Sequence, residues 1–490
     1  MRPSITDKER FKSIRSLRSL DVLNTSRKEG ETFADLAKNE IKNLCGPFIM
    51  SNEKMEAVMN TLNEQIENGL CKSPNGLRLV NTFVTEISTL REPRKYIALD
   101  FKGQYYRVSL TTVSRELDDS SMEETLYTIP KKIRSGPSEE FFNFIAETVY
   151  DFLLVRGMVE QELDMAMCFV FPVEQKSLEE AYSVRWAKEF SVPSVIGKDV
   201  VKCLSDALKR TGLKIHVRAL INDTVGVLAA CAAKDSECAM GLIVSTGTNC
   251  SYFELTEKVK FDLNLPRPSK YIVLNTEWGA FGDNGCLNEY LTEFDKAIDE
   301  NSSAPGQQIF EKMCSTLYIG EICRFIIVKA IGEKLIFGGD MPEKLTYSGY
   351  ITSQNLFEID RDPPQVYSAA EIFLRERLKI NLIRKSDLVN IRFIVRAVVT
   401  RSASLLGAAC ACLINRMKRR RVTLAVDGAF FRFSSSFPVL LVEAITQLIP
   451  YSYTFKLKLI DDGDTKGAAA VAATAVHEER MSQLGIPPDQ

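Results

Sequence analysis

The sequence contains very few histidines and no closely paired cysteines. Among its 490 residues there are two histidines, His216 and His477, and two tryptophans. This scarcity argues against a metal centre built on several histidines. The 12 cysteines include no C-x-x-C pair and no regular spacing. Without an export signal they are expected to be reduced and mostly buried, not a disulfide framework.

Long apolar segments are also missing. Residues 1–17 read MRPSITDKERFKSIRSL and contain no apolar core of the kind found in secretory signals. No apolar run approaches the roughly 20 residues that a transmembrane helix requires. We therefore expect a cytoplasmic protein with no membrane insertion.

Neither sign of charge dominates the sequence. Lys and Arg total 62 against 64 Asp and Glu, giving a formal net charge of -2. A protein with this balance has no overall field favouring nucleic acid or an anionic membrane, so no nucleic-acid partner is expected. The one dense basic run, 418–421, is interpreted as the positively charged end of a helix. With 45% hydrophobic residues, the composition is globular, and the length allows two or more domains.

The apolar pattern alternates between helix-like and strand-like segments. Helices are expected at 31–44, 53–68, 138–157, 197–211, 224–233, 307–337 and 400–417. Strands are expected at 96–100, 105–110, 165–172, 217–223, 241–249, 251–255, 423–428 and 457–461. The first two strands and the pair 241–249 and 251–255 read as hairpins, and residues 118–124 read as a polar loop. Strands followed by helices predict an α/β fold.

Three turns follow apolar strands and combine a short polar residue with glycine, at 100–103, 245–249 and 427–428. Such turns can present backbone N–H groups to a phosphate. One turn of this kind is weak support for a phosphate site. Three of them, together with the segment GDTKGAA at 463–469 that opens a helix, favour nucleotide binding.

In this order, the motifs resemble those of the hexokinases, members of the actin-like ATPase superfamily. The resemblance covers about residues 20–485 and is most specific in LNTEWGAFGDNGCL (274–287) and ALINDTVG (219–226). Further matching blocks are APGQQIFEKM with YIGEICR (304–324), VDGAFF (426–431) and DDGDTKGAA (461–469). The resemblance implies an α/β, two-domain hexokinase fold, related to actin-like ATPases and ribonuclease H, with an interdomain cleft. It places 1–92 and 222–466 in a large domain and 93–221 with 467–490 in a small one.

The resemblance also implies a reaction and its partners. Hexokinases phosphorylate a glucose-like hexose at its 6-hydroxyl with ATP and Mg²⁺, which is the first step of glycolysis. The expected partners are therefore a hexose and ATP, and the expected state is a monomer or a weak dimer.

The family's sugar-side residues match positions in this sequence. The catalytic base corresponds to Asp223, although a carboxylate there can equally cap the next helix. Lys188 matches the cation beside the transferred phosphate. The ligands of the sugar hydroxyls match Asn222, Asn249, Glu277, Gln308 and Glu311.

The nucleotide side matches in part. Asp100 corresponds to the carboxylate associated with Mg²⁺. The other nucleotide-side matches are Gly103, Thr246, Gly247, Thr248, Asp427, Gly428, Gly463 and Lys466.

Several positions depart from the family pattern. In the first phosphate loop, Lys102, Gln104 and Tyr105 stand where the family has Gly, Thr and Asn. On the sugar side, Val170 replaces a serine and Ala187 a threonine. Two hypotheses follow: a hexose kinase, with activity reduced by the altered loop, or a catalytically weak relative that acts as a sugar-binding sensor or a structural or regulatory protein.

Overall fold

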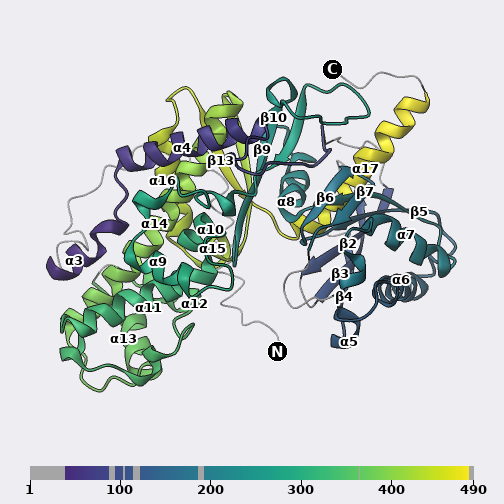
Figure 1. Cartoon of the computed structure of the whole chain (residues 1–490). Helices are drawn as coiled ribbons and strands as arrows, with labels where there is room; N and C mark the ends of the chain where they lie inside the picture. The colour runs from purple at the N-terminus through teal and green to yellow at the C-terminus, as the bar shows by residue number, and fades with distance from the viewer. Residues whose placement is uncertain are drawn as a thin grey trace.

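The computed structural model describes residues 39–87, 94–102, 105–113, 122–185, 192–363 and 365–484. Two β-sheets form separate lobes, and the helices α8 (Asp223–Ala232) and α17 (Gly463–Gln483) lie between them (Figure 1). We call these the six-stranded lobe and the five-stranded lobe. Helix α8 packs on strands of the first sheet and α17 on strands of the second, so this helix pair joins the two lobes.

The six-stranded sheet runs in the order β1-β11-β10-β9-β12-β13. Its strands are β1 (Val80–Asn81), β11 (Tyr271–Asn275), β10 (Thr248–Leu255), β9 (Cys238–Val244), β12 (Arg421–Asp427) and β13 (Thr454–Leu459). Neighbours from β1 to β9 pair antiparallel, and β12 pairs parallel with both β9 and β13. The hairpin expected at 241–255 is therefore confirmed as β9 and β10.

The five-stranded sheet runs in the order β4-β3-β2-β5-β8. Its strands are β4 (Met122–Thr128), β3 (Tyr105–Val113), β2 (Arg94–Lys102), β5 (Leu163–Cys168) and β8 (Ile215–Ile221). The first three pair antiparallel, which confirms the predicted hairpin, and β5 pairs parallel with β2 and β8. A separate hairpin consists of β6 (Val173–Ser177) and β7 (Glu180–Ser183).

Helices cover both sheets. On the five-stranded lobe, α6 (Ser138–Leu154) packs against α7 (Val200–Arg210), with the short α5 (Lys131–Arg134) beside α6. The six-stranded lobe is larger because it carries a helical bundle, at the lower left of Figure 1. Its helices are α3 (Asn39–Cys45), α4 (Asn52–Leu70), α9 (Glu293–Glu300), α10 (Ile309–Cys314), α11 (Thr316–Gly332), α12 (Ser353–Asp360), α13 (Ser368–Ile372), α14 (Lys385–Met417), α15 (Ala429–Phe433) and α16 (Phe437–Leu448).

One helix among the described residues, α14, is long and apolar enough to cross a membrane by length and composition alone. Of its most apolar 18-residue window, 89% is buried within the protein. It packs against α16, α4 and α11, so its apolar surface is covered by other helices. The small side chains between Ala403 and Ala411 permit this close packing on several sides.

Strand β2 contributes to two hydrophobic cores. Ile97, Leu99 and Phe101 face the core beneath α6 and α7, whereas Tyr96 and Ala98 face the core that includes α8 and α17. Side chains of a strand alternate between its two faces, so a strand covered on both faces must be apolar at nearly every position. This explains the uninterrupted run YIAL before Asp100.

Two expectations from the sequence need correction. Residues 122–124, expected in a loop, begin strand β4, an edge strand whose polar side chains are tolerated because β3 supplies its only paired neighbour in the described sheet. The helix expected at 307–337 is interrupted at Ser315, which has an extended backbone. The interruption is stabilised because the Ser315 hydroxyl donates to the Thr246 carbonyl at 3.0 Å and the Thr316 N–H to the Ser245 carbonyl at 2.8 Å.

Candidate active site

The predicted site residues lie where strands of both sheets end. In the five-stranded sheet, Asp100 pairs with Cys168, and Cys168 pairs with Ile221, directly before Asn222. In the six-stranded sheet, Ile243 pairs with both Asn249 and Asp427. Ligands of α/β sheets bind beyond the carboxyl ends of strands, so both lobes present their motifs at the edge where a ligand is expected.

Asn249 and Glu277 belong to one hydrogen-bonded cluster. The Asn249 amide donates to the Asn275 Oδ1 at 2.8 Å and to the Glu277 Oε1 at 3.1 Å. The Asn275 amide donates to the same Glu277 oxygen at 2.6 Å. Asn275 is buried, whereas Asn249 and Glu277 are half-buried. The buried amide therefore fixes the orientation of two half-buried polar groups that can bind hydroxyls.

Glu311 and Gln308 reach the same region from α10. A Glu311 Oε2 oxygen accepts from the Thr248 backbone N–H at 3.0 Å, and a Cβ at Gly247 would approach that oxygen to 2.5 Å. The Gln308 side chain lies against Gly279, where a Cβ would contact its oxygen. Glycines at 247 and 279 thus let these side chains pack against the backbone of the Glu277 loop and the β9–β10 turn.

Two of the predicted sugar ligands have left-handed backbones. Glu277 has φ 49° and Gln308 has φ 58°, a region that residues with a Cβ seldom occupy. Asp283 holds the second of these turns, because its carboxylate accepts from the Gln308 N–H at 3.0 Å and the Ile309 N–H at 2.9 Å. Burial raises the pKa of Asp283, although these N–H groups oppose the shift. Backbone conformations that cost free energy in this way are found most often at functional sites.

The role of helix cap falls to Asn222 and not to Asp223. The Asn222 Oδ1 accepts from the Val225 N–H at 3.0 Å, which is the N-cap interaction of α8. Asp223 is the first residue of the helix, half-buried, and its Oδ1 accepts from the Thr224 N–H at 2.8 Å. The capping explanation for the carboxylate at 223 is therefore removed, and a proton-accepting role at the helix start remains open to it.

A hydroxyl pair connects Asp223 to the Asn249 cluster. The Thr224 and Ser251 hydroxyl oxygens are 2.5 Å apart in the buried contact between α8 and β10. Ser251 follows Asn249 by two residues on β10, so both side chains lie on the same face of that strand. The start of α8 is thereby held next to the strand that carries Asn249.

The turn between β9 and β10 has the features of a phosphate loop. Thr246 is exposed, Gly247 is half-buried, and the Ser245 N–H donates to the Gly247 carbonyl at 2.8 Å across the turn. The Thr248 hydroxyl accepts from the Trp278 Nε1 at 3.2 Å, so this threonine is fixed in the core. The exposed hydroxyl and backbone of Thr246 and Gly247 are suited to binding phosphate oxygens.

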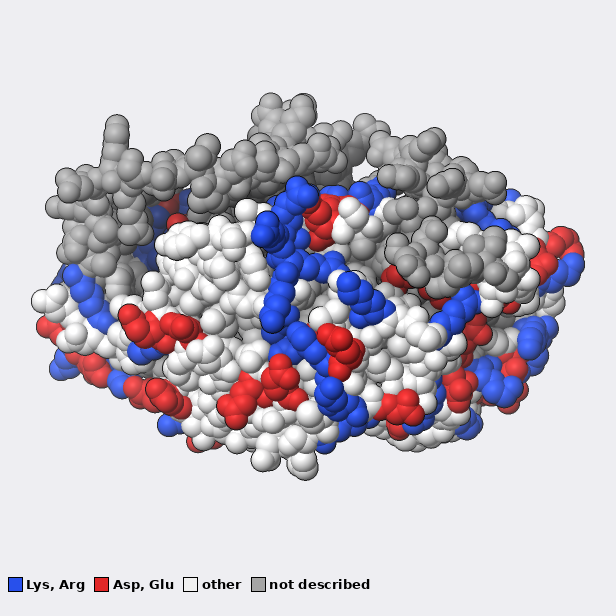
Figure 2. All heavy atoms as spheres, turned by 90° about the horizontal axis from the view of Figure 1, so that it is seen from above, with Lys and Arg blue, Asp and Glu red and all other residues white. Residues whose placement is uncertain are grey.

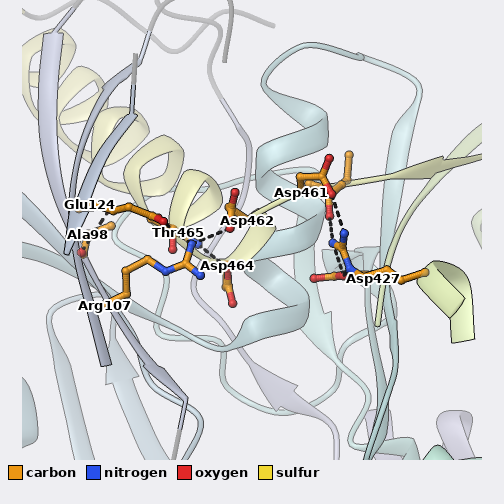
Figure 3. Close-up of polar contacts among 11 residues, drawn as sticks. Ala98, Arg107, Glu124, Asp427, Asp461, Asp462, Asp464 and Thr465 are labelled. Atoms are coloured by element: carbon orange, nitrogen blue, oxygen red, sulfur yellow. Dashed lines mark hydrogen bonds and ion pairs between the residues drawn. The ribbon is translucent and has the colours of Figure 1, made fainter. Parts of the chain in front are cut away.

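Asp427 is the last residue of β12, and the conformation of Gly428 after it is tightly restricted. Gly428 has φ 114° and lies against the Val244 carbonyl, where any Cβ would clash. The Arg432 guanidinium donates to the Asp427 Oδ1 at 2.6 Å and to the Asp461 Oδ1 at 2.6 Å. This arginine neutralises two carboxylates from different strand ends, Asp427 and Asp461, which are labelled at the right of Figure 3.

A second arginine connects the two lobes on the nucleotide side. Arg107 of β3 donates to the Asp462 Oδ1 at 2.6 Å and to the Glu124 Oε2 at 2.9 Å (Figure 3). Burial opposes the charge on Arg107, but Asp462, Glu124 and Asp100 raise its pKa. Arg107 also pairs with Asp100 across β2 and β3. A guanidinium is therefore held beside the carboxylate expected to be associated with Mg²⁺.

The glycines of GDTKG are packing positions. A Cβ at Gly463 would approach Val227 of α8 to 3.0 Å, and one at Gly467 would clash with the Gly226 carbonyl. Asp464 is buried, and a Cβ at Gly226 would approach its Cα to 2.7 Å. The close crossing of α8 and α17 accounts for these residues. Lys466 is half-buried in the first turn of α17 and stays a predicted nucleotide ligand.

Some predicted residues lie outside the described part of the chain. Lys188, Ala187, Gly103 and Gln104 are among these. Of the substituted positions that are described, Tyr105 is 46% exposed at the start of β3, and half-buried Val170 packs on the core of the five-stranded lobe. The predicted roles of Lys188 and Gly103 therefore stay predictions.

Sequence reasoning missed three supporting residues. Asn275, Trp278 and Asp283 each hold a predicted ligand or loop in place, yet none was singled out within LNTEWGAFGDNGCL. Arg107 and Arg432 were also missed, and each has one carboxylate partner far away in sequence, Asp462 at 355 residues and Asp461 at 29 residues. In the sequence, the only feature that pointed to these two arginines was that each lies a few residues from a motif matching the family.

The described residues contain no group of three or more His, Cys, Asp or Glu side chains that could hold a metal ion. Mg²⁺ in nucleotide sites is bound by one or two carboxylates together with substrate phosphates. Asp100, only 1% exposed at the end of β2, is a donor of that kind. A single carboxylate of this kind fits a magnesium ion that binds together with ATP. It does not fit a metal ion held by protein ligands alone.

Known proteins resemble this chain over most of its length. Two family models, both described as hexokinase, match residues 40–233 and 239–474. A hexokinase of Schistosoma mansoni is 37% identical over 435 residues, covering 88% of this chain and 96% of the relative. Mouse hexokinase-1 is 34% identical over 87% of this chain but only 44% of its own length, so the chain spans about half of that relative.

Solved structures agree with this similarity. A structure of Schistosoma mansoni hexokinase complexed with glucose matches with a TM-score of 0.80 and 37% identity, covering 91% of this chain and 100% of that one. A second hexokinase crystal structure matches with a TM-score of 0.78 at 26% identity, covering 89% of this chain and 99% of that one. The mixed α/β architecture of this chain is therefore that of these two structures.

Proposed function

Since this chain belongs to the hexokinase family of phosphotransferases, we propose that it transfers the γ-phosphoryl group of ATP to the 6-hydroxyl of a glucose-like hexose, the first step of glycolysis. The family assignment supports sugar phosphorylation by ATP. The choice of hydroxyl and of hexose rests on the site residues.

The observation that carries the proposal is the cluster of Asn249, Asn275 and Glu277, together with Asp223 at the start of α8. A neutral polyol is bound by amides and carboxylates with fixed orientation, because each ring hydroxyl both donates and accepts. The hydrogen bonds at 2.6 to 3.1 Å within the cluster supply that orientation. Asn222, Gln308 and Glu311 complete the proposed sugar ligands.

In the proposed reaction, the Asp223 carboxylate accepts the proton of the 6-hydroxyl. The hydroxyl oxygen forms the new O–P bond while the bond between the γ-phosphorus and the bridging oxygen breaks and ADP leaves. Positioning and charge stabilisation dominate phosphoryl transfer, so a base, held hydroxyls and nearby cations are sufficient protein chemistry. Lys188 is the proposed cation beside the transferred group.

Asp100 is the proposed carboxylate for Mg²⁺, which when bound with ATP neutralises phosphate charge. On the six-stranded side, Thr246, Gly247 and Thr248 form the proposed phosphate loop. The remaining proposed nucleotide residues are Gly103, Asp427, Gly428, Gly463 and Lys466, of which the glycines act by allowing close backbone approach.

The substitutions in the site lead us to propose reduced substrate affinity. Lys102 removes a glycine where the backbone must approach phosphate, and Gln104 removes a compact hydroxyl. Val170 and Ala187 remove two hydroxyls on the sugar side. A lost hydrogen bond to a buried partner costs about 1–3 kcal/mol, so glucose should bind more weakly than to family members that retain both hydroxyls.

A coupled assay of the purified chain with glucose, ATP and Mg²⁺ tests the proposal. ADP formation that depends on glucose is the expected result. Asp223→Asn should abolish turnover and leave glucose binding by calorimetry within a few-fold, because the base acts in the transition state. Asp151→Asn, at an exposed aspartate on α6, is the matched control and should keep full activity. Full activity of Asp223→Asn would refute the assignment of the base.

The altered first loop favours a second candidate, a catalytically weak relative that binds sugar as a sensor or a structural or regulatory protein. Glucose binding without any phosphoryl transfer, in both wild type and a loop revertant, would establish this alternative. Micromolar glucose affinity would contradict the proposed weakening of the sugar site.

We further propose the division into a large domain, 1–92 with 222–466, and a small domain, 93–221 with 467–490. The packing of α17 on the five-stranded sheet supports the assignment of the C-terminal segment to the small domain. A cytoplasmic location is proposed as well. Fractionation of cells should find the protein in the cytosol, and mitochondrial enrichment that requires residues 1–15 would contradict this.

A further inference from the structure

The small net charge of the chain hides an uneven surface. Figure 2 shows Lys and Arg gathered in a band down the middle of the face seen from above, with mainly uncharged surface on both sides and a few Asp and Glu beside the band. A formal net charge of -2 therefore does not describe the local potential. Concentrated positive charge becomes a candidate ligand site where it borders a cavity.

A cavity of about 430 Å³ lies between the two lobes on the side of β1, where Val80 of its lining pairs with Asn275 of β11. One wall consists of the loop after α4 with β1, and residues 261–264 form a second wall. The third wall is β6, from the hairpin of the five-stranded lobe. A volume of this size suits a small metabolite.

Cations from both lobes line this cavity. Lys72 and Arg78 come from the loop after α4, and Lys176 comes from β6. The carboxylates lining it are Glu174 and Asp262, so its charged lining has one more cation than anions. The pKa of Glu174 is lowered mainly by Lys176 and also by Arg78 and Lys72, as expected for three cations that line the same cavity.

The loop that carries Lys72 and Arg78 is firmly attached. The Leu77 N–H donates to the Gln65 carbonyl at 2.9 Å, and the Ser73 N–H to the Asn68 carbonyl at 2.9 Å. Leu77 and Leu79 are buried on either side of exposed Arg78, and the Lys72 Nζ lies 4.7 Å from the centre of the Phe261 ring. Both cations therefore extend from a fixed backbone, which lowers the entropy lost on binding a ligand.

Within the described part of the chain, Arg78 forms no hydrogen bond or ion pair, whereas Lys176 is paired with Glu174. We propose that this cavity binds a small organic dianion, carrying a phosphate monoester or two carboxylates, with Arg78 and Lys72 on one side and Lys176 on the other. The polar lining of Ser73, Asn81, Gln175 and Asn264 suits a ligand that also carries hydroxyls.

A ligand in this position bridges the lobes. The hairpin β6–β7 directly follows Val170 to Pro172, the segment that matches the family's sugar-side motif, and Val184 at its end donates to the Pro172 carbonyl at 3.0 Å. A dianion that holds β6 against the loop after α4 should therefore change the affinity for glucose, and by linkage glucose should change the affinity for the dianion. The binding itself does not depend on the proposed kinase activity.

Isothermal titration of the full chain at low salt tests the proposal, with glycerol phosphate, malonate and inorganic phosphate as probes. Arg78→Gln and Lys176→Gln should each weaken binding about tenfold or more, because each removes a charge-assisted hydrogen bond. Arg420→Gln, an exposed arginine elsewhere on the surface, makes the same change in net charge and should leave the affinity within twofold. Glycerol phosphate and malonate distinguish the two ligand chemistries.

Three outcomes would overturn the inference. No binding of any probe at millimolar concentration would exclude the site. Equal weakening by Arg420→Gln and Arg78→Gln would reduce it to general electrostatic attraction. Weakening by Arg78→Gln with no effect of Lys176→Gln would exclude a bridging ligand. Calorimetry requires no turnover, so an inactive enzyme that still binds the dianion would contradict the proposed function and leave this inference standing.

Discussion

Asn275 is a positioning residue whose importance follows from its two neighbours. It is buried, and its side chain contacts Asn249 at 2.8 Å and Glu277 at 2.6 Å. The sequence marked the two outer residues because they match known sugar ligands. Asn275 was missed because a buried asparagine and a half-buried one cannot be told apart in sequence.

Asn275→Ala should weaken glucose binding about tenfold to a hundredfold. The substitution removes one hydrogen bond from the Asn249 amide and one from the Glu277 carboxylate, at roughly 1–3 kcal/mol. Calorimetry with glucose measures the change, and Asn301→Ala, an exposed asparagine at the end of α9, is the control. Asn275→Asp should bind glucose still less well, since it places a second negative charge beside Glu277. Unchanged affinity in both variants would show that the cluster does not bind the sugar.

At the scale of elements, the first phosphate turn is where this chain departs most from its family. Restoring Gly at 102, Thr at 104 and Asn at 105 should raise kcat/KM for ATP about tenfold to a hundredfold, because each recovered phosphate interaction contributes about 1–3 kcal/mol. Steady-state kinetics with varied ATP measures this. An active enzyme whose ATP kinetics do not respond to the reversion would show that ATP affinity is decided elsewhere.

The crossing of α8 and α17 is a second element with a testable requirement. A Cβ at Gly467 would clash with the Gly226 carbonyl, so Gly467→Ala should destabilise the protein by about 1–3 kcal/mol. Turnover should fall as well, because α8 begins with the proposed base. Urea unfolding measures the loss. Gly332→Ala, at an exposed helical glycine with open space around it, should be neutral or slightly stabilising. Equal stability of the two variants would show that α8 and α17 can move apart to accept the extra methyl group without a loss of free energy of unfolding.

For the molecule as a whole, one buried ion pair connects elements far apart in sequence. Arg416 at the end of α14 donates to the Glu254 Oε2 of β10 at 2.7 Å and to the Glu67 Oε1 of α4 at 2.7 Å. Burial would raise the pKa of Glu254, but Arg416 outweighs it and lowers the pKa below 4.5. The folded state therefore gains stability from this carboxylate above that pH and loses it as the pH falls through the lowered value.

Glu254→Gln should reduce stability at pH 7 by roughly 3 kcal/mol, because buried Arg416 loses the buried one of its two carboxylate partners. The difference from wild type should shrink in acid, where Glu254 itself becomes protonated. Chemical unfolding at neutral and acidic pH measures both effects, and Glu333→Gln, at an exposed glutamate, is the control. A difference that stays constant with pH would show that Glu254 does not titrate with unfolding.

The sequence by itself determined the α/β class, both hairpins, most helices and the strand-end positions of the candidate residues. These features depend on local periodicity and on turns, which a few neighbouring residues encode. The resemblance to hexokinases rested on the same strand-end motifs, and the comparisons confirmed it. The role of Asp223 as base stays a prediction, strengthened because Asn222 is the cap of α8.

Only the tertiary structure decided which groups meet. The break at Ser315 exists because the β9–β10 turn supplies its hydrogen bonds, and no local pattern contains that information. The contact of Arg107 with Asp462 joins residues 355 positions apart, and the cavity between Arg78 and Lys176 joins two lobes. The contact of Arg107 with Asp462 depends on how α17, which begins at Gly463, packs on the five-stranded sheet. The close crossing of α17 with α8 depends on Gly226, Gly463 and Gly467, whose role becomes visible only when both helices are in place.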